Sequence, residues 1–167
     1  LDTDERRRFA QVSHEYLIEQ LQYVEPSATD KTIDLNFNHP VKELIWTGAW
    51  TAGKFASLTL DTVTLKLNGH DRFSARDQTY FTRTQIWEHH TGPGGFDSDA
   101  AGSMDDSIGV YSFALKPEEH QPSGTCNFSR IDSAQITRGT GAAWNIYAVN
   151  YNVLRIMSGM GGLAYSN

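Results

Sequence analysis

Residues 142–157 read AAWNIYAVNYNVLRIM and form the longest run of the sequence with an extended, alternating pattern. The alternation places Tyr147, Val149, Tyr151 and Val153 on one face of the chain. Successive side chains of a β-strand point to opposite faces, so a period of two residues indicates a strand. The stretch therefore predicts a long strand near the end of the chain.

The same pattern recurs in shorter runs along the rest of the sequence. In KTIDLNFNHP, residues 31–40, Ile33, Leu35 and Phe37 share one face. In DTVTLKLNGHDRFS, residues 61–74, alternating apolar residues lead into Asn68-Gly69, a pair that tolerates the positive φ angles of a hairpin turn. Further short strands are predicted within VKELIWTGAW, IGVYSFAL, TCNFSRID and AQIT, which begin at residues 41, 108, 125 and 134.

Three segments depart from this pattern. Residues 13–25, SHEYLIEQLQYVE, fit a helix or a strand, and we favour the strand. ARDQTYFTRTQIWEHH lacks alternation and predicts one short helix at about 76–87, whereas the Gly, Ser and Asp-rich residues 91–107 predict a long loop. About eight strands with Gly- and Pro-rich turns indicate an all-β, antiparallel sandwich or barrel.

Composition limits the class of protein. The 167 residues, 39% hydrophobic and 20% charged, fit one globular domain. The net charge of −6 argues against nucleic-acid binding, and Arg6, Arg7 and Arg8 are interpreted as a solvated or interface cluster. One cysteine excludes an intramolecular disulfide, no apolar run reaches the about 18 residues of a membrane span, and no signal peptide is seen. The start without methionine suggests a fragment of a longer protein.

Polar residues gather in PEEHQPSGTCNFSRID, residues 117–132. Pro122, Ser123 and Gly124 are typical turn residues, so the preceding acids and histidine are expected at a solvent-facing loop. Cys126 alternates with Phe128, which predicts a buried structural thiol rather than a nucleophile. We expect no catalytic residue and no cofactor.

Some residues are compatible with a metal site, a glycosidase or a sugar-binding platform as well as with a structural role. Glu88, His89, His90 and His120 could bind a metal, but adjacent histidines rarely face one ion. Asp105, Asp106, Glu118 and Glu119 could supply a glycosidase carboxylate pair, but nothing in the sequence pairs them. Trp46, Trp50, Trp87 and Trp144 could form a sugar-binding platform, although core packing is favoured. A carbohydrate-binding module or a glycan-active enzyme remains the alternative function.

Three stretches carry a family resemblance: LNFNHPVKELIW, GVYSFALKPEEHQPSGTCNFSRID and YAVNYNVLRIMSGMGGLAYSN. They resemble the C-terminal half of the major capsid protein of large icosahedral double-stranded DNA viruses, closest to the algal and giant-virus branch. The resemblance implies an eight-stranded jelly roll over residues 1–167, the second of two in a chain that begins before Leu1. It also implies a structural protein of the virion capsid, assembled in the host cytoplasm, and no enzyme.

The resemblance implies partners as well. Three copies would form a homotrimer of pseudo-hexagonal outline, which meets neighbouring capsomers and minor capsid proteins, without direct nucleic-acid contact. We expect five residues to act as subunit contacts or to fix the turn: Glu118, Glu119, His120, Arg130 and Asp132. Arg130 is expected to pair with Asp132 or with a neighbouring acid.

Overall fold

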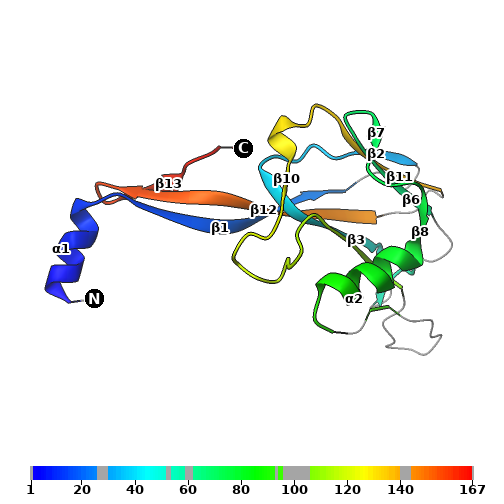
Figure 1. Ribbon diagram of the computed structural model, residues 1–167, viewed down its shortest axis with the longest axis horizontal. Coiled ribbons are helices and arrows are strands. Elements are labelled where there is room, and N and C mark those ends of the chain that lie inside the picture. Colours follow the sequence, from blue (N-terminus) through cyan, green and yellow to red (C-terminus); the bar gives the residue numbers. More distant parts are fainter. Residues whose placement is uncertain are drawn as a thin grey trace.

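The protein is a sandwich of two antiparallel sheets (Figure 1). The computed structural model describes residues 2–25, 30–51, 54–58, 62–92, 94–95, 106–139 and 144–166. Within this part of the chain the all-β, antiparallel prediction is confirmed. Thirteen strands are assigned there instead of about eight, because several are pieces of only two residues.

The larger sheet has the order β1-β12-β3-β10, with β9 paired to β3 and β13 paired to β12. Its strands are β1 His14–Val24, β3 Pro40–Gly48, β9 Ile108–Ser112, β10 Cys126–Asn127, β12 Trp144–Met157 and β13 Met160–Leu163. The strand favoured for residues 13–25 is therefore confirmed, and it pairs with β12 along its whole length.

The smaller sheet has the order β2-β11-β6-β7, with β8 also paired to β6. Its strands are β2 Thr32–Asp34, β6 Thr62–Leu67, β7 His70–Asp71, β8 Arg76–Asp77 and β11 Ala134–Arg138. The predicted hairpin is confirmed: Asn68 and Gly69 have φ angles of 52° and 79° between β6 and β7. A separate hairpin joins β4 Trp50–Thr51 to β5 Lys54–Phe55.

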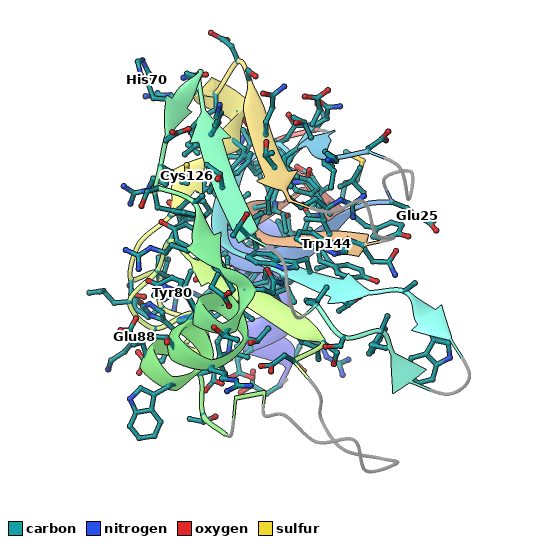
Figure 2. All side chains as sticks on the ribbon, turned by 90° about the vertical axis from the view of Figure 1, so that its right-hand side faces the viewer. Glu25, His70, Tyr80, Glu88, Cys126 and Trp144 are labelled. Carbon is teal, nitrogen blue, oxygen red and sulfur yellow. The ribbon has the colours of Figure 1, made fainter. Side chains whose placement is uncertain are left out.

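The core lies between the two sheets. On β12 it is formed by the face opposite to the one that carries Tyr147 and Val149. Trp144, Ile146 and Ala148 are buried there, whereas Tyr147 and Val149 lie on the other face and are only half-buried. Figure 2 shows Trp144 in the interior. Both faces of β12 carry apolar residues, so alternation alone could not identify which face belongs to the core.

Aromatic rings fill the centre of this core. The rings of Trp46 and Trp144 stack with centroids 6.0 Å apart, and Phe81 lies 5.2 Å from Trp46. A Cβ added at Gly109, opposite Trp46 on β9, would lie 2.4 Å from the indole nitrogen, so only glycine fits there. The guanidinium of Arg138 lies over the Trp144 ring, with its Cζ 5.1 Å from the ring centroid.

Two helical segments flank the sheets. The predicted helix at about 76–87 is present but begins later, as a π-helical turn, η1 Tyr80–Thr84, followed by α2 Gln85–His89. Arg76 and Asp77 belong to β8, and the Asp77 carboxylate accepts hydrogen bonds from the Thr79 backbone and hydroxyl just before the helical turn. Most of the predicted loop at 91–107 lies outside the described residues.

A second helix, α1 Thr3–Gln11, was not predicted. Asp2 and Glu5 form a capping box at its start, since each side chain accepts a hydrogen bond from the other residue's backbone. None of its residues is buried, and its sequence TDERRRFAQ has no apolar stripe that would predict an amphipathic helix. The cluster Arg6, Arg7 and Arg8 lies on this helix.

One end of the larger sheet extends beyond the smaller sheet as a ribbon, with α1 at its tip (Figure 1). We call this part, residues 2–18 and 152–166, the arm. β12 is paired with β3 only as far as Asn150, and beyond that point its neighbours are β1 and β13. In the described residues, no helix is both long enough and apolar enough to cross a membrane.

Candidate functional site

Residues 113–123, the contact segment, contain three of the five predicted contact residues. The segment leaves β9 and is fastened to β3, because the backbone N–H groups of Phe113 and Ala114 both donate to the Lys42 carbonyl. Ser123 closes it: its hydroxyl accepts from the Lys116 N–H at 2.9 Å. Pro117 is buried. The segment is therefore an anchored loop and not a freely projecting one.

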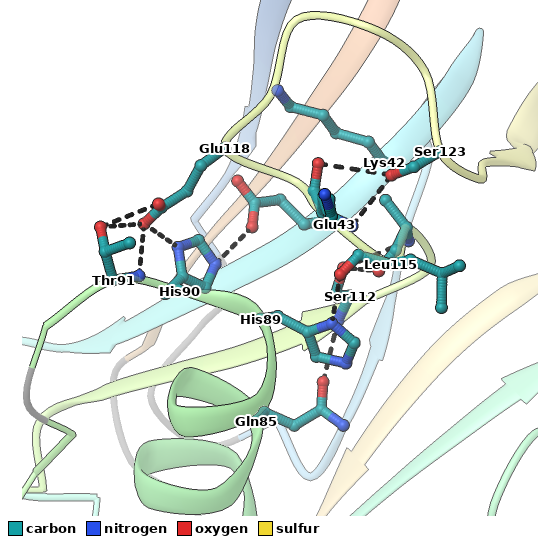
Figure 3. A network of polar contacts seen from close by, with 12 residues as sticks. Lys42, Glu43, Gln85, His89, His90, Thr91, Ser112, Leu115, Glu118 and Ser123 are labelled. Atoms are coloured by element: carbon teal, nitrogen blue, oxygen red, sulfur yellow. Dashed lines mark hydrogen bonds and ion pairs between the residues drawn. The ribbon is translucent and has the colours of Figure 1, made fainter.

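Glu118 is directed towards the end of α2 and is engaged within the chain (Figure 3). Its carboxylate accepts hydrogen bonds from the Thr91 backbone N–H and hydroxyl, both at 2.8 Å. It also lies 3.2 Å from Nδ1 of His90. The Thr91 hydrogen bonds, with a smaller contribution from His90, lower the pKa of Glu118 below its ordinary value.

His90 lies between two carboxylates. Its Nε2 is 2.9 Å from a carboxylate oxygen of Glu43 on β3, opposite the contact with Glu118. The hydrogen bond to Glu43 raises the pKa of His90, against the opposing effect of burial, and Glu118 adds to the increase. The Glu43 side chain is almost completely buried, so this contact also compensates a charge that lies away from water.

Glu119 and His120 point to other partners. Glu119 pairs with Lys116 at 3.1 Å, an exposed contact within the segment. His120 lies 3.6 Å from Glu19 of β1, which in turn accepts a hydrogen bond of 2.7 Å from the buried ammonium of Lys42. The segment is thus held by ion pairs to Glu19 of β1 and to His90 at the end of α2, and by backbone hydrogen bonds to β3.

Arg130 is the last residue of the short 3-10 helix η2 Phe128–Arg130, and Asp132 lies in the turn that follows it. Both are exposed, and within the described residues no ion pair joins them, so the first of the two expected pairings is absent. The alternative, that Arg130 pairs with a neighbouring acid, stays a prediction. Asn68 fixes the turn instead, because its Oδ1 accepts from the backbone N–H groups of Asp132 and Ser133. The hydrogen bonds that fix this turn therefore come from Asn68 and not from the Arg130 side chain.

The metal hypothesis gains no support from the geometry. His89 contacts the Leu115 carbonyl and Glu88, His90 contacts two carboxylates, and His120 approaches Glu19. His89 and Glu88 contact each other, whereas His90 and His120 have different partners, and over the described ranges no group of three or more acids, histidines or cysteines could hold an ion.

Cys126 is half-buried on β10, and Phe128, expected on the same strand, lies in η2. Burial raises the pKa of Cys126, which disfavours the nucleophilic thiolate. The prediction of a structural thiol therefore agrees with its surroundings.

The glycosidase and sugar-platform hypotheses also lose their candidate residues. Asp106 is buried and bound by the Thr82 hydroxyl and the Arg83 guanidinium, while Asp105 lies outside the described residues. Of the four tryptophans, Trp46 and Trp144 are in the core, and Trp50 and Trp87 are exposed on separate elements. The predicted core role is therefore correct for two of them.

The outer side of the larger sheet carries a group of apolar side chains, of which the sequence pattern had already placed Tyr147, Val149 and Val153 on one face. The group consists of Leu17, Leu21 and Tyr23 of β1, Tyr147, Val149 and Val153 of β12, and Ile45 of β3. We call it the outer face. Two acids lie on the same face, Glu19 between Leu17 and Leu21 and Glu43 opposite Val149. The cross-strand pairs Leu17–Val153, Leu21–Val149 and Tyr23–Tyr147 align these side chains, and the two tyrosine rings stack at 5.1 Å. The side chains of β1 are exposed there, with Leu21 at 62%.

The chain matches a family model described as large eukaryotic DNA virus major capsid protein over residues 5–162. It is 52% identical over 186 aligned positions to the major capsid protein of Pyramimonas orientalis virus. It is 39% identical over 237 positions to that of Paramecium bursaria Chlorella virus 1. These alignments cover the whole chain but 47% and 52% of the two relatives. The chain therefore spans about half the length of the curated relatives that it matches.

Solved structures agree. A chain in the quasi-atomic model of the PBCV-1 virus capsid superimposes with a TM-score of 0.77 at 39% identity, covering all of this chain and 55% of that one. The Faustovirus major capsid protein, at 13% identity and a TM-score of 0.54, shares the fold. The predicted jelly-roll sandwich is therefore confirmed.

Proposed function

Because the chain belongs to the family of major capsid proteins of large eukaryotic DNA viruses, we propose that it is one jelly roll of a capsid subunit. Its work is to pack against other jelly rolls of the same kind in the shell of an icosahedral virion. The outer face is the observation that carries this proposal. Large exposed apolar patches are rare on monomeric proteins and mark surfaces where proteins meet.

The chain is proposed to be the C-terminal half of a double jelly-roll polypeptide, in line with its coverage of about half of its relatives. Three such polypeptides would place six similar sandwiches around one axis and give a homotrimer of pseudo-hexagonal outline. Trimers would then meet neighbouring trimers and minor capsid proteins, with assembly in the host cytoplasm. No catalytic step is part of this function.

Replacing Leu21 with glutamate is expected to prevent trimer formation by the full-length polypeptide. A carboxylate in the middle of an apolar interface must be desolvated without a partner, which costs several kcal/mol, on the order of a thousandfold in the association constant. Analytical ultracentrifugation of the wild type should show a trimer, and of the Leu21→Glu variant mainly a smaller species.

Trp87→Glu is the matched control, because this side chain is 82% exposed and lies on α2, which is not a strand of the larger sheet. It should leave the trimer intact. A wild-type polypeptide that stays monomeric, or a Leu21→Glu variant that trimerises normally, would refute the proposal. Glycan binding is not expected of either variant.

Arg130→Ala is expected to weaken the trimer without changing the stability of the isolated subunit. The side chain is exposed, and its replacement should alter the free energy of unfolding by no more than about 0.5 kcal/mol. If Arg130 meets an acid of a neighbouring subunit, its loss should raise the dissociation constant. Unchanged assembly and unchanged melting of the trimer would exclude Arg130 from the interface.

A further inference from the structure

We propose that His90 is the clasp of a pH-sensitive latch that holds the contact segment against β3 and α2, and so presents Glu119 and His120 to a neighbouring subunit. The latch consists of the contacts of His90 with Glu43 and Glu118, together with the hydrogen bonds from Thr91 to Glu118 (Figure 3). This inference deepens the proposed function and rests on it for the role of the segment in assembly.

The geometry requires a proton on His90. A neutral imidazole has one N–H donor and one acceptor, whereas the protonated ring has two donors. Both ring nitrogens of His90 face carboxylate oxygens, at 2.9 Å and 3.2 Å. A neutral ring would direct a lone pair at one of these oxygens, so only the protonated ring satisfies both.

The two carboxylates come from parts of the chain that are also joined by the backbone hydrogen bonds of Phe113 and Ala114 to Lys42, but His90 is the side chain that contacts both carboxylates. Glu43 is fixed in the centre of the larger sheet, while Glu118 belongs to the contact segment. His90 is the residue at which α2 ends. Loss of the proton therefore weakens the connection between Glu118 and the sheet. Among the described residues, it also removes the cationic partner 2.9 Å from the buried Glu43.

Other titratable groups lie on the elements around His90. They are Glu88 and His89 on α2, Lys42 on β3, Lys116, Glu119 and His120 on the contact segment, Glu19 on β1 and Tyr151 on β12. Among the described residues, Glu43 and Glu118 are the acids within 4.0 Å of the His90 ring. Lys42 is directed to Glu19 and to the Tyr151 ring, and His89 to Leu115 and Glu88. The two nearby carboxylates thus dominate the ring's environment.

The direction of the pH response follows from these contacts. The pKa of His90 is raised in the folded protein, so the latch stabilises the fold fully below the ordinary histidine value and loses this effect as pH rises through the raised value. The pKa of Glu118 is lowered, so its contribution is lost only as pH falls through that lowered value. The latch is therefore closed at mildly acidic pH and opens on alkalinisation.

Opening of the latch would affect assembly through the residues that the contact segment carries. Glu119 and His120 are exposed and lie one and two positions after Glu118. A fixed segment presents them in one arrangement, whereas a released one must be ordered again when a partner binds, which lowers affinity. The trimer should therefore be tighter at pH 6 than at pH 8.5.

The test measures amide hydrogen exchange of the full-length polypeptide between pH 5.5 and 9, corrected for the intrinsic pH dependence of exchange, together with sedimentation at each pH. In the wild type, protection of residues 90–91 and 113–123 should fall by up to about tenfold per pH unit above the His90 pKa. In His90→Gln, which carries no proton to lose, protection should be low and independent of pH. Glu118→Gln keeps the size of the side chain but removes its charge, so it should lower the protection of residues 113–123. A weaker pH dependence should remain, because Glu43, the main cause of the raised pKa of His90, is still in place.

His70→Gln is the matched control, because His70 lies on the exposed β6–β7 hairpin (Figure 2). It should keep the wild-type pH dependence. The latch is refuted if His90→Gln retains that dependence, or if trimer affinity does not change with pH while protection does. A polypeptide that is monomeric at every pH would instead refute the proposed capsid role. The exchange data would still test whether protection of the contact segment depends on His90.

Discussion

Replacing Trp46 with alanine is expected to lower the free energy of unfolding by about 3–5 kcal/mol, the usual cost of deleting a large buried aromatic side chain. Trp46 is fully buried and contacts Trp144 and Phe81. Within the part of the chain that the structure describes, its indole N–H has no hydrogen-bond partner, so the loss is one of packing between the sheets. The backbone of Gly109 lies directly against the ring, and it offers no side chain to fill the resulting cavity.

Denaturant unfolding followed by circular dichroism would measure this loss. Trp87→Ala is the control, since it removes the same atoms from a position exposed to solvent, and it should change stability by no more than about 0.5 kcal/mol. Equal effects of the two substitutions would mean that Trp46 does not lie between the sheets.

Replacing Asp106 with alanine should cost about 3 kcal/mol. The Asp106 side chain is fully buried and accepts hydrogen bonds from Thr82 at 2.6 Å and from Arg83 Nε at 2.9 Å. Removing one partner of a buried ion pair typically costs 3–5 kcal/mol. We expect the lower end of that range, because the guanidinium of Arg83 is partly exposed and can turn to water.

The comparison for Asp106 is Asp71→Ala, which breaks the exposed pair of Asp71 with Lys66 at 3.8 Å. Exposed pairs contribute about 0–1 kcal/mol, so this variant should melt close to the wild type. Thermal melts of both variants in the same buffer would suffice. A fully stable Asp106→Ala variant would contradict the burial of that carboxylate.

The strands were predictable because alternation is a local property of the chain. The runs at Ile33 and Val63 and the turn at Asn68-Gly69 are confirmed, since each depends on residues within a few positions of one another. The inner side of β12 was not predictable, because both of its faces carry apolar residues. Helix α1 was missed because its stability comes from capping and not from an apolar stripe.

The surroundings of the candidate site were harder to predict. The contact of His90 with Glu43 joins residues 47 positions apart, and that with Glu118 spans 28 positions. Glu43 and Glu118 come together because β3 pairs with β9, which precedes the contact segment. A short sequence motif with fixed spacing cannot describe such a contact. The sequence therefore indicates a contact residue at Glu118 and a metal candidate at His90, and no pattern in it combines the two.

The arm has a mechanical consequence. β12 runs from the arm into the sandwich without interruption, paired with β1 from Val24 to His14 and with β3 over its first half. A pull on the tip along this direction loads the hydrogen bonds between the strands in parallel, so they must break together and not one after another. A tension applied at the tip of the arm would thus act along the strands as shear, the loading to which a β-ladder is most resistant.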